Sequence, residues 1–328
     1  MKYRLLGKTG FKVSEISLGT WQVGGKWGSG FDHKNAATII NTAIDNGVNF
    51  IDTADVYESG LSEAAVGKAI RNRSERVYVA TKCGRFINPH VSEGYQAKVL
   101  QQYIENSLKN MGLETLDLIQ LHCPPTAVYY RPEIFELFDR LKEQGKILHV
   151  GVSVEKVEEA LKAIEYPTVS TVQIIANVFR QRPMELFFKE AAKRNVGIIV
   201  RVPLASGLLT GTYHANKEFS AGDHRNFNRE GAAFDKGETF AGINYELGLQ
   251  AVAALKAIFP NTSNLAPIAL KWLLQFKELS CIIPGASTPA QVHSNLSASS
   301  LPALSEEQIA AMNAVYETYI KKEVHHLW

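Results

Sequence analysis

The chain has 328 residues, of which 45% are hydrophobic and 21% charged, and its formal net charge is +2 at pH 7. This balance is typical of a globular protein and excludes nucleic acid or an acidic membrane as a partner recruited by charge. We expect a cytoplasmic protein, because no apolar run approaches the roughly 18 residues that span a bilayer and no secretory segment opens the chain. Three cysteines, Cys83, Cys123 and Cys281, are too few and too scattered for a disulfide framework.

The first part of the chain predicts a hairpin and then a strand and a helix. Residues 3–16 read as two short strands about the turn residues 7–10. Residues 16–21 predict the first long strand, and a glycine-rich segment, 24–30, follows it. Apolar residues then recur at helical spacing from Ala36 to Ile44.

Three strand-like runs each end on a titratable residue. Residues 50–52 end on Asp52 with Tyr57 five positions later, residues 77–82 end on Lys82, and residues 116–122 end on His122. The carboxyl ends of the strands of a parallel barrel open onto one face, where the chemistry is found. The sequence therefore predicts that these four side chains lie together.

The alternation of strands and helices continues to the end of the chain. Helices are predicted through Ala64 to Ile70 and over residues 97–111, 133–144, 157–164 and 184–194, and strands over 146–153, 171–175, 196–201 and 280–284. Eight units without a long linker favour one (β/α)8 TIM barrel, a single domain over residues 1–328, rather than a doubly wound sheet. Two additions are expected: a long loop after strand 7, residues 211–243, and a C-terminal helix over 306–319 with a tail ending in Trp328.

Taken singly, each of the four strand-end residues has a structural interpretation. Taken together, the four residues favour a functional interpretation. A lysine among apolar strands must be paired, and Asp52 on the neighbouring strand is its expected partner. Alternation along the strands directs Cys83 and Cys123 away from Lys82 and His122 or into loops, so we predict no metal site.

The residues Asp52, Tyr57, Lys82 and His122, with their intervals, resemble the catalytic tetrad of the aldo-keto reductases, and the resemblance runs over nearly the whole chain. It implies a hairpin that plugs the barrel and reduction of a carbonyl group. In that reaction Tyr57 would be the general acid, Lys82 would lower its pKa, Asp52 would hold Lys82, and His122 would orient the carbonyl.

No G-x-G-x-x-G motif follows a first strand, so a Rossmann site is not expected. The resemblance implies NADP(H) laid across the barrel mouth, with NAD(H) possible. Val154 replaces an amide-binding Asn of the family, Arg201 replaces a stacking aromatic, and Gly285 and Gln291 replace the Lys and Arg that grip the 2′-phosphate. The implied cofactor-binding residues are Gly19, Thr20, Trp21, Asp52, Ser153, Gln173, Arg201, Val202, Pro203, Leu204, Ala205, Gly207, Leu208, Thr210, Arg225, Gly285, Ala286, Ser287, Thr288, Gln291 and Asn295.

Aromatic residues in the loops of the same face predict the substrate pocket, and they favour aldehydes, ketones or sugars without fixing which. The pocket residues expected are Trp21, Trp27, Tyr57, Phe86, His122, Tyr129 and Trp328. Monomeric and homo-oligomeric forms both stay open. Two rival functions are a non-catalytic nucleotide-binding barrel that acts as a redox-sensing regulatory subunit, and a metal-dependent hydrolase built on Asp52, His122 and His33. The hydrolase lacks the paired ligands that such a site needs.

Overall fold

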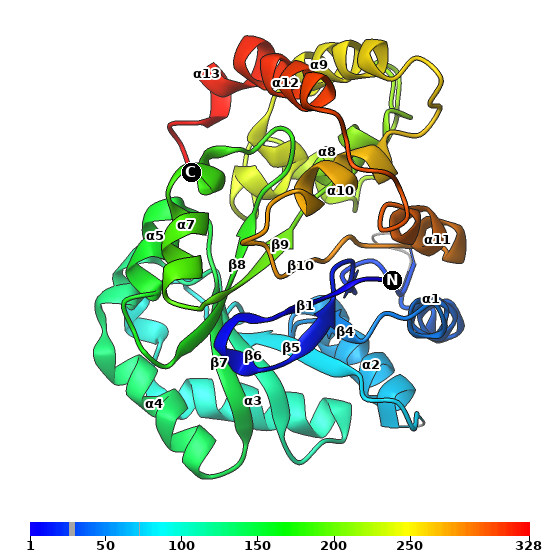
Figure 1. Cartoon of the computed structure of the whole chain (residues 1–328). Helices are drawn as coiled ribbons and strands as arrows, with labels where there is room; N and C mark the ends of the chain where they lie inside the picture. The colour runs from blue at the N-terminus through cyan, green and yellow to red at the C-terminus, as the bar shows by residue number, and fades with distance from the viewer. Residues whose placement is uncertain (26–29, 72) are drawn as a thin grey trace.

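The computed structural model describes residues 1–25, 30–71 and 73–328, and its centre is a barrel of parallel strands (Figure 1). Eight strands pair in the order β10-β9-β8-β7-β6-β5-β4-β3. Isolated parallel bridges from Ile16 to Ile282 and from Gly19 to Gly285 bring the two edges together and nearly close the ring. The predicted (β/α)8 barrel is confirmed. Its strands are β3 (Leu18–Gly19), β4 (Phe50–Asp52), β5 (Tyr78–Cys83), β6 (Leu116–His122), β7 (Ile147–Ser153), β8 (Val169–Ile175), β9 (Gly197–Arg201) and β10 (Cys281–Ile282).

The strands are buried on both faces, as a parallel barrel requires. Every residue of β6 and β8 is buried. Buried polar residues interrupt these two strands, among them Gln120 in β6 and Gln173 in β8. The strands at the closing edge, β3 and β10, are two residues long each, shorter than predicted, since the bridges between them are isolated.

A hairpin closes the bottom of the barrel, as predicted. Strands β1 (Tyr3–Leu5) and β2 (Lys12–Ser14) pair antiparallel. Leu6, directly after β1, and Val13, in β2, pack inside the barrel against Phe50 and Leu118. The hairpin leaves the opposite end, where the strands finish, free to form a site.

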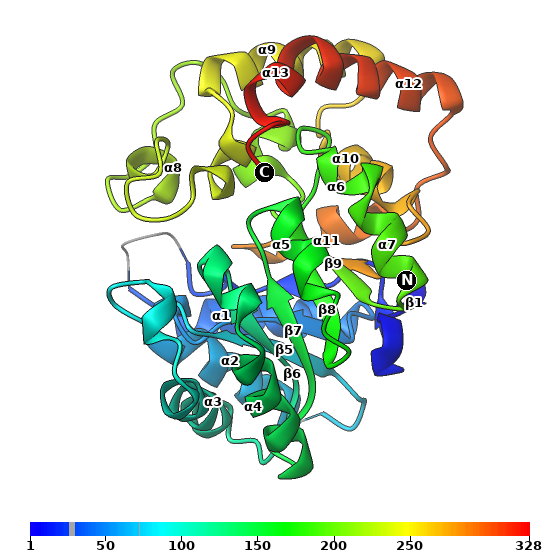
Figure 2. The same cartoon turned by 90° about the vertical axis from the view of Figure 1, so that its left-hand side faces the viewer.

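Helices surround the barrel (Figures 1 and 2). They begin with side-chain caps where the sequence offers them, for example Asp32 before α1 and Asn244 before α9. The helices are α1 (His33–Asp45), α2 (Leu61–Arg71), α3 (Ala97–Met111), α4 (Pro132–Glu143), α5 (Val157–Ala163), α6 (Arg182–Glu185), α7 (Phe187–Lys193), α8 (His224–Phe227), α9 (Tyr245–Ile258), α10 (Ala266–Leu274), α11 (Pro289–Ser297), α12 (Glu306–Val315) and α13 (Lys321–Val324).

Two regions differ from the predicted elements. The helix expected over residues 184–194 is divided into α6 and α7, because Leu186 leaves the helical conformation at φ −126°. The C-terminal helix runs further than expected, through a π-helical turn at Tyr316–Ile320 into α13. It packs against α9, which the sequence analysis did not assign, in a layer at the top of the molecule (Figure 2).

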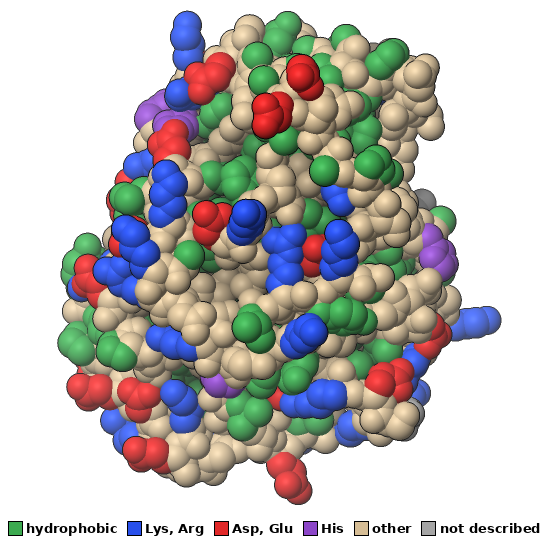
Figure 3. Space-filling model, viewed as in Figure 1, with side chains coloured by type: hydrophobic (Ala, Val, Ile, Leu, Met, Phe, Trp, Pro, Cys, Tyr) green, Lys and Arg blue, Asp and Glu red, His purple; other side chains and the backbone are tan. Residues whose placement is uncertain are grey.

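The surface carries charges of both signs. On the face shown in Figure 3, basic and acidic side chains are interspersed, in keeping with the small net charge. In the described part of the chain, no helix has both the length and the apolar character needed to cross a membrane.

Candidate active site

Lys82 lies at the centre of the predicted tetrad. Its ammonium Nζ donates to Asp52 Oδ1 at 2.5 Å, to the Thr53 carbonyl at 2.8 Å and to Tyr57 Oη at 3.2 Å. The Lys82 side chain is 1% exposed, so these three acceptors replace water around a buried charge. The register of β4 and β5 pairs Asp52 with Ala80, two residues before Lys82, and the turn after β4 returns Tyr57 to the same ammonium.

Two amides hold the second oxygen of Asp52. Gln173 Nε2 donates to Asp52 Oδ2 at 2.7 Å, and Gln120 Nε2 donates to the same atom at 3.1 Å. The sequence analysis listed Gln173 among the cofactor-binding residues. In this structure its amide nitrogen orients Asp52, and the residue also lines the cavity described below.

Burial raises the pKa of Tyr57, and the Lys82 ammonium opposes this rise without reversing it. The expectation that Lys82 brings the pKa of Tyr57 below its ordinary value is therefore corrected for this state. For Lys82, burial lowers the pKa but Asp52 and Tyr57 outweigh it, so the pKa is raised. At neutral pH the pair is a protonated phenol beside an ammonium.

His122 faces Tyr57 as a neutral ring. Burial, together with the charges of Arg85 and Lys82, lowers the pKa of His122 well below its usual value. The two rings meet edge to face, with centroids 6.0 Å apart. Among the described residues His122 Nδ1 has no hydrogen-bond partner although it is buried. A neutral imidazole can donate one hydrogen bond to a ligand oxygen.

A cavity of about 610 Å³ opens at the mouth of the barrel, and Asp52, Tyr57 and His122 of this group line it. Its volume falls in the range of pockets that bind organic ligands, roughly 300–1,000 Å³. Its wall runs from the tetrad to the start of α11, and the residues predicted for the cofactor or the tetrad that line it are Gly19, Thr20, Trp21, Asp52, Tyr57, His122, Gln173, Arg201, Val202, Pro203, Leu204, Gly207, Thr210, Arg225, Gly285, Gln291 and Asn295.

The other residues predicted for the cofactor lie behind or beside this wall: Ser153, Ala205, Leu208, Ala286, Ser287 and Thr288. Ser153 is fully buried, and its Oγ lies 3.4 Å from Cys123 Sγ. The Ser287 amide and hydroxyl both donate to Gln291 Oε1, at 2.7 and 3.0 Å. Gln291 is thus held at the cavity rim by its oxygen, and its NH₂ group is the end left for a ligand.

Of the aromatic residues predicted for the substrate pocket, some line the cavity and others do not. Trp21 lines the cavity and stacks near Tyr57, with ring centroids 6.1 Å apart. Tyr129 is fully buried and donates to the Ser153 carbonyl, Phe86 is 46% exposed, and Trp328 packs on the long loop, so these three do not line the cavity. Trp27 lies outside the described residues.

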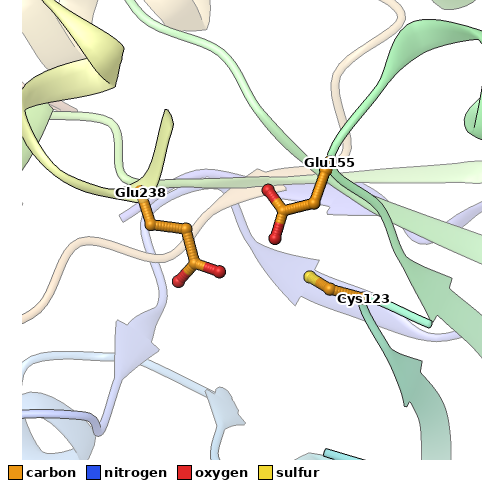
Figure 4. A group of neighbouring side chains, drawn as sticks. All are labelled: Cys123, Glu155 and Glu238. Carbon is orange, nitrogen blue, oxygen red and sulfur yellow. The ribbon is translucent and has the colours of Figure 1, made fainter. Parts of the chain in front are cut away.

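An acidic group at the mouth was missed by the sequence analysis. Figure 4 shows Cys123, Glu155 and Glu238, whose ligand atoms lie within 4.8 Å of one another, a set that could hold a metal ion. Two arginines already meet these carboxylates: Arg85 Nη1 donates to Glu238 at 2.9 Å and Arg201 Nη2 donates to Glu155 at 2.8 Å. Because guanidinium groups compete with a cation for the same oxygens, the cluster is better described as an ion-pair network.

The two carboxyl groups of this network differ in charge. Burial raises the pKa of Glu155, whereas Arg85 and Arg201 overcome burial and lower the pKa of Glu238. At neutral pH Glu155 therefore holds a proton and Glu238, which lines the cavity, is the anion. No local pattern joins Glu238 to Arg85, 153 positions away in the chain. The sequence shows only that Glu238 belongs to the long loop of residues 211–243.

Backbone strain gathers at the same face. Cys123, directly after β6, has φ 46°, and Val202, directly after β9, has φ 51°. Positive φ is unfavourable for a β-branched residue and is often found at functional sites. Cys123 thus lies in the turn after β6, the loop position that the sequence analysis allowed for it, and its sulfur is 3.4 Å from Arg201 Nη2.

Comparison with known proteins gives one family. The family model described as "Aldo/keto reductase family" matches residues 15–317. Aldo-keto reductase YhdN of Bacillus subtilis (strain 168) is 29% identical over an alignment of 330 positions, which covers 99% of this chain and 96% of the relative. The NADH-specific methylglyoxal reductase of Escherichia coli (strain K12) is 28% identical, covering 91% and 93%. A probable voltage-gated potassium channel subunit beta of Oryza sativa subsp. japonica is 25% identical, covering 98% of each.

Among solved structures, the aldo-keto reductase AKR11C1 from Bacillus halodurans in its holo form superposes with a TM-score of 0.77. It is 24% identical, and the match covers 96% of each chain. At this identity the likeness shows the barrel fold.

Proposed function

Because the chain belongs to the aldo/keto reductase family and is an NAD(P)H-dependent enzyme of that family, we propose that it reduces a carbonyl group to an alcohol, with Tyr57 as the proton donor. The observation that carries this proposal is the position of Lys82 Nζ, bonded to both Asp52 and Tyr57 at the wall of a ligand-sized cavity.

Carbonyl reduction needs a proton donor and groups that favour charge on the carbonyl oxygen. The phenol of Tyr57 is protonated at neutral pH, and the ammonium of Lys82 beside it would stabilise the phenolate left after the proton moves. His122, which is neutral and lines the cavity beside Tyr57, would donate a hydrogen bond to the same oxygen. Asp52 would hold Lys82 in place, itself oriented by Gln120 and Gln173.

The cavity fits a nicotinamide cofactor. Its wall includes residues of the tetrad and of the turn before α11. At Gly285 the nearest neighbour of an added Cβ would be Gln22 Oε1 at 3.8 Å, so the backbone there can approach a ligand closely. Backbone amides near the start of α11 suit a phosphate. The cofactor, when bound, supplies the hydride. We propose that NADPH is preferred over NADH, with dual use possible, since Gln291 and Asn295 remain at the cavity wall.

Tyr57→Phe tests the proposal. It removes the proton donor while leaving the ring that lines the cavity, so NADPH should bind as in the wild type while kcat for 4-nitrobenzaldehyde falls by about 10²–10⁴. Cofactor fluorescence titration and steady-state kinetics give the two quantities. A variant that keeps more than about half of the wild-type kcat would remove Tyr57 from the mechanism.

The channel-subunit relative favours one second candidate, a nucleotide-binding barrel that reports redox state without appreciable turnover. It predicts tight NADPH binding and no oxidation of bound NADPH by 4-nitrobenzaldehyde. Single-turnover absorbance of pre-bound NADPH separates the two functions, since a reductase consumes the cofactor and a sensor does not.

A further inference from the structure

One segment of the long loop reaches the cavity and is fastened there on two sides. We call residues 235–242 the arm. Its Glu238 lines the cavity and accepts from Arg85 at 2.9 Å. Ser206, also in the cavity wall, donates to the Glu238 carbonyl at 3.1 Å. The arm therefore connects the tetrad end of the cavity with the segment predicted to contact the cofactor.

The backbone of the arm is strained. Phe240 and Ala241 both have positive φ, 52° and 59°. A non-glycine residue held in this region costs about 1–3 kcal/mol and persists only where its surroundings fix it. Contacts from outside the loop must therefore hold the arm in this conformation.

The last residue of the chain supplies such a contact. Trp328 is only 6% exposed, and its Nε1 donates to Asp235 Oδ1 at 2.9 Å. Its ring packs flat on Gly242, where a Cβ would lie 2.5 Å from the ring. The C-terminal tail that carries Trp328 descends from the helical layer of α12 and α13 (Figure 2).

Arg180 joins the tail to the strained residues. Its guanidinium lies 4.0 Å from the centroid of the Trp328 ring, and its Nη2 donates to the Ala241 carbonyl at 3.1 Å and to the Gly237 carbonyl at 3.4 Å. Arg180 is 1% exposed and forms no salt bridge with a carboxylate of the described residues. The face of the Trp328 ring is thus a principal partner of the Arg180 guanidinium. Burial strengthens this cation–π contact, because water does not compete for the cation.

We propose that Trp328 is a positioning residue that holds Glu238 in the cavity wall, and that the Glu238 carboxylate accepts a hydrogen bond from a hydroxyl group next to the substrate carbonyl. Glu238 is the anionic member of its pair and faces the same cavity as Tyr57 and His122. A carboxylate accepts from hydroxyl groups and repels anions. The class of substrate is a neutral hydroxyaldehyde or hydroxyketone, and this inference rests on the proposed function.

The test compares glycolaldehyde, which carries the hydroxyl, with 4-nitrobenzaldehyde, which does not. Trp328→Ala should raise KM for glycolaldehyde about tenfold, a typical coupling for residues in contact, and change KM for 4-nitrobenzaldehyde by less than about threefold. Glu238→Gln should give the same selective loss, and the double variant should be little worse than either. Leu327→Ala, the exposed neighbour in the tail, is the matched control.

Equal losses for both aldehydes, or multiplicative losses in the double variant, would overturn the proposal. If Trp328→Ala does not fold, Trp328→Phe keeps a ring over Arg180, removes only the bond to Asp235, and should give a smaller selective rise in KM. Limited trypsin digestion tests, without an activity measurement, whether Trp328 holds the arm in place. Cleavage within residues 211–243 should be about tenfold faster in Trp328→Ala and unchanged in Leu327→Ala. If the wild type reduces neither aldehyde, the proposed function fails. If Trp328→Ala is digested at the wild-type rate, Trp328 does not hold the arm, and the positioning role is overturned.

Discussion

At the residue scale, the chemistry of the site depends on one buried ammonium with three acceptors. Lys82 neutralises Asp52 and contacts the phenol of Tyr57, so removing it leaves a buried carboxylate without its cation. Lys82 has a second role. Because the pKa of Tyr57 is raised, its phenol is protonated in this state, and the ammonium of Lys82 stabilises the phenolate only once the proton has left.

Lys82→Met should therefore lower kcat by nearly as much as Tyr57→Phe, about 10²–10⁴. Because the two groups act as one unit, the double variant should be little slower than either single one. Steady-state kinetics at saturating cofactor measures the three losses, and thermal unfolding checks that each variant is folded. If the losses multiply, the lysine and the tyrosine act independently.

Asp55, three residues from the tetrad Asp, is a different kind of buried acid. It is 4% exposed, and among the described residues neither of its carboxyl oxygens accepts a well-formed hydrogen bond. Burial, reinforced by the Glu63 carboxylate, raises the pKa of Asp55 to about 8. The unfolded chain ionises this group near pH 4. The folded state thus binds the proton more tightly, and stability falls as the pH rises from about 4 to about 8.

Asp55→Asn removes this charge, so the variant should be more stable than the wild type at pH 8–9, by about 1–3 kcal/mol for an unpaired buried group. At pH 5, where Asp55 is protonated in the fold, the difference should be small. Urea unfolding across pH 5–9 measures both. Glu143→Gln, at an exposed position of α4, is the control whose pH profile should match that of the wild type. Parallel profiles for Asp55→Asn and the wild type would contradict the raised pKa.

At the element scale, the barrel is weakest where β3 and β10 close it with isolated bridges. The seam depends on close backbone approach: a Cβ at Gly19 would lie 2.8 Å from the Ile283 carbonyl oxygen, whereas one at Gly285, its bridge partner, would meet nothing nearer than 3.8 Å. The two glycines therefore meet different constraints. At Gly19 a side chain would clash with the neighbouring backbone, and at Gly285 a side chain would enter the cavity.

Gly19→Ala should destabilise the fold by about 1–3 kcal/mol, the usual effect of overpacking, and lower the midpoint of thermal unfolding. Gly285→Ala should leave that midpoint nearly unchanged but weaken cofactor binding, because its methyl group enters the cavity. Differential scanning calorimetry and cofactor titration give the two readouts. If both variants lose the same stability, the two glycines do not differ in packing, and the distinction drawn between Gly19 and Gly285 is wrong.

The elements that the sequence predicted best are those with a strong local pattern. Helix α3 and strand β6 have the predicted bounds, because the helix has a regular amphipathic pattern and the strand is rich in Leu and Ile up to the turn at Cys123 and Pro124. Trp328 was predicted as pocket wall because only its type and its place at the chain end were visible. Its contact with Asp235 joins positions 93 residues apart, and no periodicity encodes such a pairing. The tetrad was predictable because each member marks the end or the turn of a strand, whereas Glu238 marks neither.

At the scale of the whole molecule, the cavity joins chemistry to recognition across the barrel mouth. Its tetrad end is built on β4, β5 and β6, and its far end on the turn between β10 and α11. A dinucleotide that spans the cavity would therefore be held by separate groups at its nicotinamide and its adenosine ends. A change at the far end should alter which cofactor binds without altering the reaction of the one that is bound.

Gln291→Arg tests this separation. Gln291 lies at the cavity rim with its oxygen tied to Ser287 and its NH₂ group toward the ligand side. A guanidinium there would add a charge-assisted hydrogen bond, worth about 1.5–3 kcal/mol, to the 2′-phosphate that NADPH has and NADH lacks. Kd for NADPH should fall by roughly 10–100-fold while Kd for NADH stays nearly constant, and kcat at saturating NADPH should not change.

Fluorescence titration of both cofactors gives these constants, and Gln291→Leu, which removes the amide without adding charge, is the matched control. The gain should shrink at high salt, because the new contact is an exposed ion pair that ions screen. Equal tightening of NADPH and NADH would place residue 291 away from the 2′-phosphate. A wild-type preference for NADH, as the name of one relative suggests for that protein, would mean that replacing the family's Lys and Arg with Gly285 and Gln291 had reversed the specificity, because neither residue supplies a cation to offset the two phosphate charges.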